Sequence, residues 1–295
     1  MQRAYADPGS EAWREYHLGI FNLTTRYPSR WQEDWATTGL RTLCYEYEDQ
    51  FLTYHAPPKE RRSPTDFVAW LPEKLPTIDS GNTPLVKFLL EGDVSQEQWR
   101  IYAAAMICRG RVHHRNLGHL AENIEDEERV CFVYRMLGDE GGQGDYNAAH
   151  ATLVAPFLKH LGGGPEDVQK VADLFEMKVL ANWMNRCFLH KSPIWGAAAI
   201  CYLEHQAGRE FTMMLPRVRQ VGFPEEVLEF FTVHGGELDL PDHGNEVEYH
   251  NRMCRELVGS ILASPDDVGT AYTAMVRAGE VFRDAFAATG RLMGV

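Results

Sequence analysis

The feature that most constrains the fold is a succession of helix starts from residue 82 onward. Asn82-Thr83-Pro84 offers an N-cap and an early proline, and Ser95-Gln96-Glu97-Gln98 forms a capping box. Further starts follow at Pro165, Pro193 and Pro224, each ahead of apolar residues at helical spacing. Helices are also expected over about residues 147–161 and 240–262. Strand-like alternation is almost absent. The sequence therefore predicts an all-α bundle of about seven or more helices.

Length, charge and cysteine content limit the class of protein. The chain has 295 residues and 44% hydrophobic content, enough for a sizeable core. A net charge of -13 argues against a nucleic-acid partner, which would require a basic patch. No apolar run is long enough for a membrane span or a signal sequence. The six cysteines lack a CxxC pair and suit reduced core thiols. We therefore expect a cytoplasmic protein without nucleic-acid or membrane partners.

The first 80 residues differ from the remainder. Their apolar content is modest and broken by prolines, and residues 56–64 must form a loop. We expect residues 1–80 to be an N-terminal extension that packs on the core or serves as a dimer arm, which would make the protein a homodimer. Residues 81–295 are expected to form the helical domain.

A carboxylate and an imidazole flank a glycine-rich stretch between two apolar runs. Glu140 stands at the end of the first run, and His150 begins the second. Burying both beside apolar surface costs several kcal/mol unless something pairs them, and a metal ion would do so. We predict that both are metal ligands. The alternative is a solvated helix end followed by a glycine stop.

Two further segments carry candidate ligands. The stretch from Ile194 to Leu203 is apolar nearly all round and is followed by Glu204. A buried Glu204 would need a partner, whereas a Glu204 on a solvent-exposed edge of the helix would not. The second segment, residues 230–250, begins with the aromatic pair Phe230-Phe231. The candidate ligands that follow this pair are His234, Asp239, His243, Glu246, Glu248 and His250. Imidazole and carboxylate donors without thiolate suit iron or manganese. The alternative is a polar loop in which Asp239 caps the next helix.

These residues together resemble the haem-oxygenase-like di-iron oxidases and oxygenases, relatives of the TenA and PqqC helical fold. The resemblance covers about residues 82–262 and rests on Asp139-Glu140-Gly141-Gly142 with His150, on Glu204 in its apolar helix, and on His234 after its aromatic segment. It implies a haem-oxygenase-like (TenA/PqqC-like) helical bundle.

The resemblance also implies a catalytic centre of two Fe(II) ions, with O2 as co-substrate. Its ligands would be Glu140, His150, Glu204, His234, Asp239 and His243. In the family the last three lie on one helix as His-x-x-x-Asp-x-x-His, but here Leu238 and Pro241 occupy the later two positions. A helix break or π-bulge would be needed to restore the facing of Asp239 and His243.

The activity that the resemblance implies is that of a non-haem di-iron oxidase or oxygenase. Its substrate would be a small amine or amino-acid-like molecule, and its reaction N-oxygenation, desaturation or oxidative C–C cleavage, as in natural-product biosynthesis. Two alternatives stay open. One is a metal-independent TenA/PqqC-like enzyme that uses Cys201 and Glu204, and the other is a non-catalytic bundle with a decayed metal site that binds a ligand or partner.

A small basic cluster lies near the expected core. Its members are Arg109, Arg111, His113, His114 and Arg115. We expect a solvated helix end there, although the cluster could also dock a substrate carboxylate.

Overall fold

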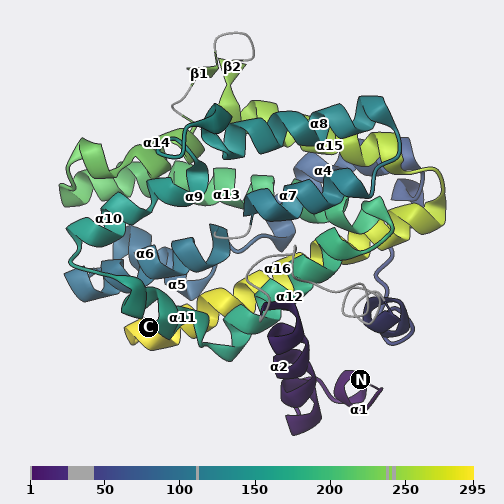
Figure 1. Cartoon of the computed structure of the whole chain (residues 1–295), viewed down its shortest axis with the longest axis horizontal. Helices are drawn as coiled ribbons and strands as arrows, with labels where there is room; N and C mark the ends of the chain where they lie inside the picture. Colours follow the sequence, from purple (N-terminus) through teal and green to yellow (C-terminus); the bar gives the residue numbers. More distant parts are fainter. Residues whose placement is uncertain (1, 26–42, 111–112, 237–238, 241–243) are drawn as a thin grey trace.

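The computed structural model describes residues 2–25, 43–110, 113–236, 239–240 and 244–295 (Figure 1). Its helices are α1 (Gln2–Ala6), α2 (Glu11–Thr25), α4 (Pro64–Ile78), α5 (Pro84–Glu91), α6 (Gln96–Gly110), α7 (His113–Glu122), α8 (Glu127–Glu140), α9 (His150–Leu153), α10 (Ala155–His160), α11 (Pro165–Ala172), α12 (Phe175–Leu189), α13 (Pro193–Val221), α14 (Glu229–His234), α15 (Glu246–Ile261) and α16 (Pro265–Met293). The 3₁₀ helices are η2 (Lys59–Arg61), η3 (Gly142–Gly144) and η4 (Glu225–Val227). Residues 43–48 are helical as well. The predicted all-α architecture is confirmed.

The long helix α13 forms the centre of the bundle and packs against α12, α14, α15 and α16. Pro193 occupies its first turn, where the missing N–H costs nothing, and Gly222 ends it in the left-handed region at φ 92°. Its first half is buried on every side, from Trp195 to Tyr202. As the sequence predicted, such a helix lies inside the molecule rather than on its surface.

The N-terminal residues contact the bundle at several points. Helix α4 packs on α15 and α16, and α2 packs on α12 but projects from the body (Figure 1). Arg186 of α12 is buried, stacks over the Trp195 ring at 4.1 Å, and pairs with Asp49 and with Glu48, the latter at 2.9 Å. A domain boundary at residue 80 and a dimer arm stay predictions.

The connection between α8 and α9 covers residues 141–149 and contains η3. Asp126 caps the start of α8, and Gly141 follows its end. Gly142 has φ 64°, and a Cβ there would collide with the backbone of Ala148. We expected one helix over about residues 147–161, but the structure begins α9 at His150 and breaks it from α10 at Val154. The connection sets His150 beside Glu140 at the end of α8.

The segment after α14 also differs from the expectation. A helix was expected from about residue 240, but β1 (Asp239–Leu240) pairs antiparallel with β2 (Gly244–Asn245) in a short hairpin that projects from the helical body (Figure 1). The side chain of Asn245 then caps α15 by accepting from the Glu248 N–H at 3.1 Å. Asn245, and not Asp239, is therefore the N-cap of this helix.

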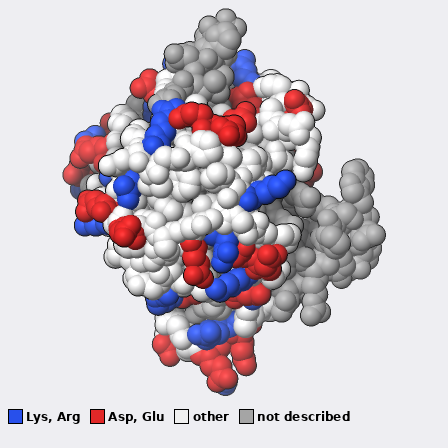
Figure 2. All heavy atoms as spheres, turned by 90° about the vertical axis from the view of Figure 1, so that its left-hand side faces the viewer, with Lys and Arg blue, Asp and Glu red and all other residues white. Residues whose placement is uncertain are grey.

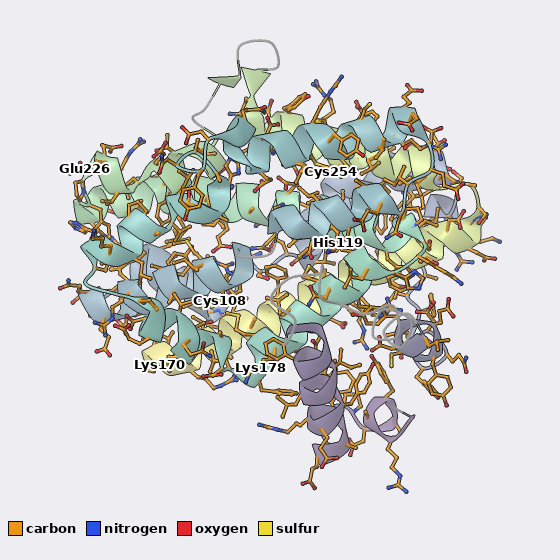
Figure 3. The ribbon with its side chains drawn as sticks, viewed as in Figure 1. Cys108, His119, Lys170, Lys178, Glu226 and Cys254 are labelled. Carbon is orange, nitrogen blue, oxygen red and sulfur yellow. The ribbon has the colours of Figure 1, made fainter. Side chains whose placement is uncertain are left out.

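The cysteines are free thiols, as expected, but not all lie in the core. Cys187, Cys201 and Cys254 are buried, whereas Cys131 is exposed. Figure 3 labels Cys254 on α15, where its Sγ lies 3.4 Å from Met136 Sδ of α8. None of the helices in the described ranges combines the length and hydropathy that a membrane span requires.

Candidate metal centre and substrate cavity

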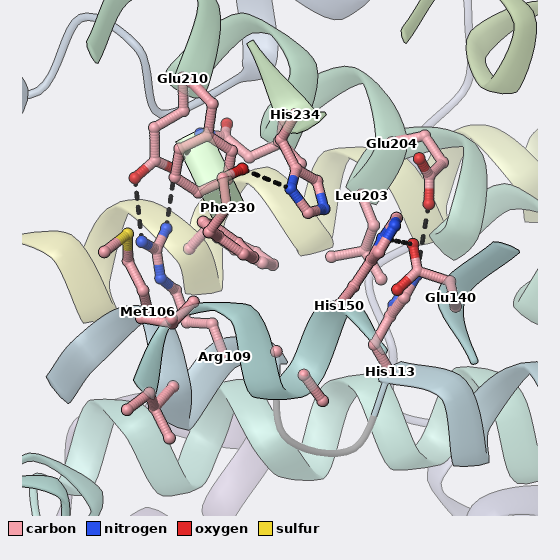
Figure 4. A pocket seen from close by; sticks show the side chains of 18 residues that line it. Met106, Arg109, His113, Glu140, His150, Leu203, Glu204, Glu210, Phe230 and His234 are labelled. Carbon is pink, nitrogen blue, oxygen red and sulfur yellow. Dashed lines mark hydrogen bonds and ion pairs between the residues drawn. The ribbon is translucent and has the colours of Figure 1, made fainter. Parts of the chain in front are cut away.

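Six helices bring imidazoles and carboxylates to one place inside the bundle. Figure 4 shows this group beside the cavity, except for His250, which lines a smaller cavity together with His150, Glu204 and His234. The contributing residues are His113 of α7, Glu140 of α8, His150 of α9, Glu204 of α13, His234 of α14 and His250 of α15. We call these six residues the imidazole–carboxylate cluster.

Glu140 lies between two imidazoles. Its Oε1 is 3.0 Å from His150 Nδ1 and 3.8 Å from His113 Nε2. Burial alone would raise the pKa of Glu140, but the charges of His150 and His113 outweigh that effect and lower its pKa to about 2. Glu140 is therefore an ionised carboxylate inside the protein.

Glu204 joins the two sides of the cluster. Its Oε1 lies 3.2 Å from His113 Nε2, and its Oε2 lies 3.4 Å from His250 Nδ1. Although burial raises its pKa, the hydrogen bonds from His113 and His250 hold the pKa well below the usual range. The partner that Glu204 was predicted to need is thus imidazole.

His234 is oriented as a ligand would be. Its Nδ1 lies 2.9 Å from the carbonyl oxygen of Phe230, one helical turn earlier, and the ring packs at 4.6 Å from the ring of His150. With the Nδ1–H donated to Phe230, Nε2 carries the free lone pair. Burial lowers the pKa of His234 to about 4, so the ring is neutral at pH 7.

His250 reaches the cluster because α13 and α15 approach closely. A Cβ on Gly208 would collide with Val247, so only glycine permits this approach. Glu204 lies one turn before Gly208, and His250 lies nearly one turn after Val247. His250 Nε2 is also 3.1 Å from Asp139 Oδ2, a pairing that orients many metal-binding histidines.

The donor atoms suit metal ions in both spacing and chemistry. Two groups, Glu140/His150/His234 and His113/Glu140/Glu204, each offer three ligand atoms within 4.8 Å of one another, and Glu140 belongs to both. Ligands about 2.1 Å from a metal lie up to about 4 Å apart, so small side-chain movements would close each group around an ion. Nitrogen and oxygen donors without sulfur favour iron or manganese over copper(I).

A second, smaller cavity adjoins the cluster. It measures about 10 Å³, and its lining includes His150, Glu204, His234 and His250. This volume is near that of a single water or ion. The space between the imidazoles therefore matches one small occupant.

The main cavity has a volume of about 100 Å³ and ends at a buried ion pair. Its remaining lining is largely apolar and includes Met106, Ile107, Val154, Leu203, Phe211, Phe230 and Phe282. Figure 4 shows Arg109 and Glu210 on one side of this cavity, and Glu140, His113 and Glu204 on the other. Arg109 donates to Glu210 through both terminal nitrogens, at 2.8 and 2.9 Å.

The structure brings four of the predicted ligands together and places the other two elsewhere or leaves them undescribed. Glu140, His150, Glu204 and His234 lie in the cluster. The backbone of Asp239 lies in β1 of the projecting hairpin, and His243 lies outside the described residues (Figure 1). The assignment of these two as ligands stays a prediction.

Sequence reasoning missed His113 and His250 as members of the cluster. His113 was expected on a solvated helix end together with Arg109, but both side chains are buried or nearly so and line the cavity. His250 was noted only as part of a polar segment. Val247 and His250 share one face of α15, but the Gly208 that packs against this face is recognised only from the packed helices.

Two of three comparisons relate the chain to known proteins. A family model described as iron-containing redox enzyme matches residues 100–280. A search of the curated proteins found no match. Among solved structures, a domain of unknown function with a haem-oxygenase-like fold from Shewanella denitrificans is similar, with 14% identity, a TM-score of 0.61, and coverage of 78% of this chain and 93% of that one. A TenA homologue from Pseudomonas syringae pv. tomato has 13% identity, a TM-score of 0.58, and coverage of 80% and 98%.

These likenesses confirm the predicted haem-oxygenase-like fold. The family also agrees with the predicted class of activity, at the level of an iron-containing oxidoreductase. With more than half of its length matched, this chain belongs to the iron-containing redox enzyme family.

Proposed function

We propose that this protein is a non-haem di-iron oxidase or oxygenase that uses O2 to oxidise a small amine or amino-acid-like substrate, as in natural-product biosynthesis. The observation that carries the proposal is the position of Glu140, which belongs to two groups of potential ligands at once. A carboxylate shared between two donor groups is suited to span two neighbouring cations.

The ligand sets follow from the two groups. His113, Glu140 and Glu204 would hold one ion, and Glu140, His150 and His234 the other. His250, which faces the small cavity beside His150 and His234, would supply the imidazole that the sequence led us to expect from His243. Two Fe(II) ions held in this way would supply the electrons and the Lewis acidity for reaction with O2.

The protein side chains orient the imidazole ligands, supply negative charge and surround the cavity with apolar walls. The Phe230 carbonyl and the Asp139 carboxylate fix the His234 and His250 rings, so that their other nitrogens face the cluster. Glu140 and Glu204 offset the charge of bound cations. The largely apolar walls would disfavour water in the space where substrate would lie.

The absence of a nucleic-acid partner stays an expectation from the net charge of -13. On the face drawn in Figure 2, the coloured Lys and Arg side chains lie scattered among Asp and Glu rather than in one basic patch. A small-molecule substrate is the partner that a cavity of about 100 Å³ supports.

The metal-independent alternative requires a reactive Cys201. Its side chain is 1% exposed and does not line either cavity, and burial raises the pKa of its thiol to about 12. A thiol of this kind is a poor nucleophile at neutral pH. These observations favour the metal-dependent function.

The test is anaerobic loading with Fe(II), followed by metal analysis and measurement of O2 uptake. We expect about two irons per chain and O2 consumption after exposure to air. Protein loaded with Zn(II), which has no redox chemistry, is the control and should take up no O2. Failure to bind iron, or iron binding without O2 consumption, would contradict the proposal.

A further inference from the structure

The connection between α8 and α9 holds one glutamine in a backbone conformation that favours glycine. Gln143 has φ 53° and ψ 28°, and in the described parts of the chain it is the only residue other than glycine with a positive φ. Its neighbours Gly142 and Gly144 have φ values of 64° and 93°. A glycine at position 143 would adopt this conformation without strain, whereas a glutamine adopts it only under constraint.

The packing of the connection fixes the conformation of its residues. A Cβ on Gly142 would lie 2.5 Å from the backbone of Ala148, so Gly142 packs directly against the part of the connection that leads into α9. The Asp145 N–H donates to the Gly142 carbonyl oxygen at 2.9 Å across Gln143. The side chain of Gln143 is exposed, so apolar packing does not explain why glutamine stands there. A strained residue without a packing role points to a function of its side chain.

The side-chain amide of Gln143 holds the carboxylate of Asp139. Gln143 Nε2 donates to Asp139 Oδ1 at 2.7 Å, and Asp139 Oδ2 lies 3.1 Å from His250 Nε2. Gln143 and His250 thus engage one carboxylate oxygen each. The side chain of Asp139 is 20% exposed, against 6% for His250. Without Gln143 the carboxylate would be free to turn towards water, because the χ2 torsion of aspartate has broad minima.

The other nitrogen of the His250 ring faces the imidazole–carboxylate cluster. His250 Nδ1 lies 3.4 Å from Glu204 Oε2, and His250 lines the small cavity of the site. The direction in which one ring nitrogen points is set by the hydrogen bond that the other makes. A row of contacts therefore leads from the exposed Gln143, through Asp139 and His250, to Glu204.

We propose that Gln143 is a positioning residue, which fixes Asp139 and through it the His250 ring at the imidazole–carboxylate cluster. The left-handed backbone of residue 143 brings its amide over Gly138 of α8, within reach of Asp139. The inference rests on the proposed function, in which His250 supplies one of the metal ligands. It makes the affinity for metal depend on a residue that lines neither cavity.

Titration of the full chain with Co(II) tests the inference without any reaction. The variant Gln143→Gly removes the amide and suits the left-handed backbone, so it should keep the thermal unfolding midpoint of wild type. We expect it to bind Co(II) roughly tenfold more weakly, at the lower end of the loss that follows removal of an outer hydrogen-bond partner. The visible absorption of bound Co(II) should change as well, because one ligand is no longer held in its direction.

Two further variants show whether the effect passes through Asp139. Asp139→Asn alone should weaken Co(II) binding by about ten- to hundredfold. Adding Gln143→Gly to Asp139→Asn should then change the affinity by no more than about twofold, because the contact that Gln143 serves is already lost. The matched control is Asn147→Gly, which introduces the same residue at another exposed position of the connection. This control should bind Co(II) as wild type does.

The metal-free protein separates this inference from the proposed function. Nitrogen-15 NMR of the histidine rings reports the hydrogen bonding of His250, whose signals are identified by their loss in His250→Gln. Gln143→Gly should shift the His250 signals and leave those of His205, which pairs with Asp79, in place.

Unchanged His250 signals in Gln143→Gly, or a Co(II) affinity equal to that of wild type, would overturn the role of Gln143. Additive losses in the double variant would overturn the route through Asp139. If wild type binds neither Co(II) nor iron but the His250 signals still move, the di-iron proposal fails while Gln143 remains the residue that positions His250.

Discussion

The two ends of the main cavity are both polar and buried, but their charges are balanced in different ways. At one end Arg109 and Glu210 form a permanent ion pair, completed by Tyr102 and Gln206. At the other end Glu140 and Glu204 lie near each other, and their ion-pair partners among the described residues are imidazoles. An arginine is charged at every accessible pH, whereas an imidazole is neutral or charged according to its surroundings.

This contrast shows what each end is built to do. A guanidinium–carboxylate pair needs no further partner to stay buried, so it forms a fixed wall. At the other end, burial lowers and the neighbouring carboxylates raise the pKa values of His113 and His250, and the carboxylates prevail, so that both pKa values are raised. A cation would displace these protons and bind the nitrogen and oxygen donors in their place. The same bundle thus has one polar end that is completed by its own side chains and one end whose donors suit a metal ion.

The largest effect should come from removing the carboxylate that both metal positions share. In Glu140→Gln we expect iron content to fall from about two per chain to none, because each donor group loses a ligand. Metal analysis measures this loss, and circular dichroism checks that helical content is kept. His205→Gln is the control, since His205 pairs with Asp79 outside both cavities. Full iron occupancy in Glu140→Gln would show that the metal lies elsewhere.

Breaking the ion pair between Arg109 and Glu210 should reduce the stability of the fold and leave metal binding intact. Arg109→Met strands Glu210 as a buried charge, and we expect a loss of about 3–5 kcal/mol in the free energy of unfolding. Denaturant unfolding measures it. The double variant Arg109→Met/Glu210→Gln removes both charges and should recover most of the loss. If Arg109→Met were as stable as wild type, the ion pair would not stabilise this side of the cavity.

Metal should stabilise the protein only through the imidazole–carboxylate cluster and not through the Arg109–Glu210 end of the cavity. At a concentration one hundred times the dissociation constant, a cation that binds only the folded protein adds about 2.7 kcal/mol to the free energy of unfolding. We expect Zn(II) to raise the thermal unfolding midpoint of wild type and of Arg109→Lys alike. The same addition to Glu140→Gln should cause no shift. A shift in that variant would place the stabilising metal outside the cluster.

The smallest effect concerns the hydrogen bond from Tyr102 to Glu210. Tyr102→Phe removes one of the four donors to a buried carboxylate, so we expect a loss of about 1.5 kcal/mol in the free energy of unfolding. Denaturant unfolding compares this variant with wild type, and iron content should not change. An unchanged stability would mean that water replaces the Tyr102 hydroxyl, and Glu210 would then be more accessible to water than its burial indicates.

Much of the helical framework could be predicted because helix starts depend on neighbouring residues. The capping box at Ser95 forms as expected, since Ser95 Oγ accepts from the Gln98 N–H and Gln98 Oε1 accepts from the Ser95 N–H. At the preceding start Thr83, and not Asn82, provides the cap. The break at Val154 and the hairpin before α15 were missed because turn geometry there depends on contacts beyond the local sequence.

The chemistry of the site was partly visible in the sequence. Glu140, His150, Glu204 and His234 each interrupt or border an apolar helical run, so their need for partners could be inferred from local burial. His113 and His250 carry no such local signal. Their participation depends on α7 and α15 packing against helices that are distant in the sequence.

The sequence by itself determined that the chain is helical and that buried acids and imidazoles, without thiolates, supply its candidate ligands. Capping, helical periodicity and donor chemistry are properties of single residues and their near neighbours. Only the tertiary structure decided which donors meet, because that depends on helix–helix contacts such as Gly208 against Val247. The pairing of Arg109 with Glu210 was decided in the same way, since α6 and α13 supply one partner each and only their packing brings the two charges together.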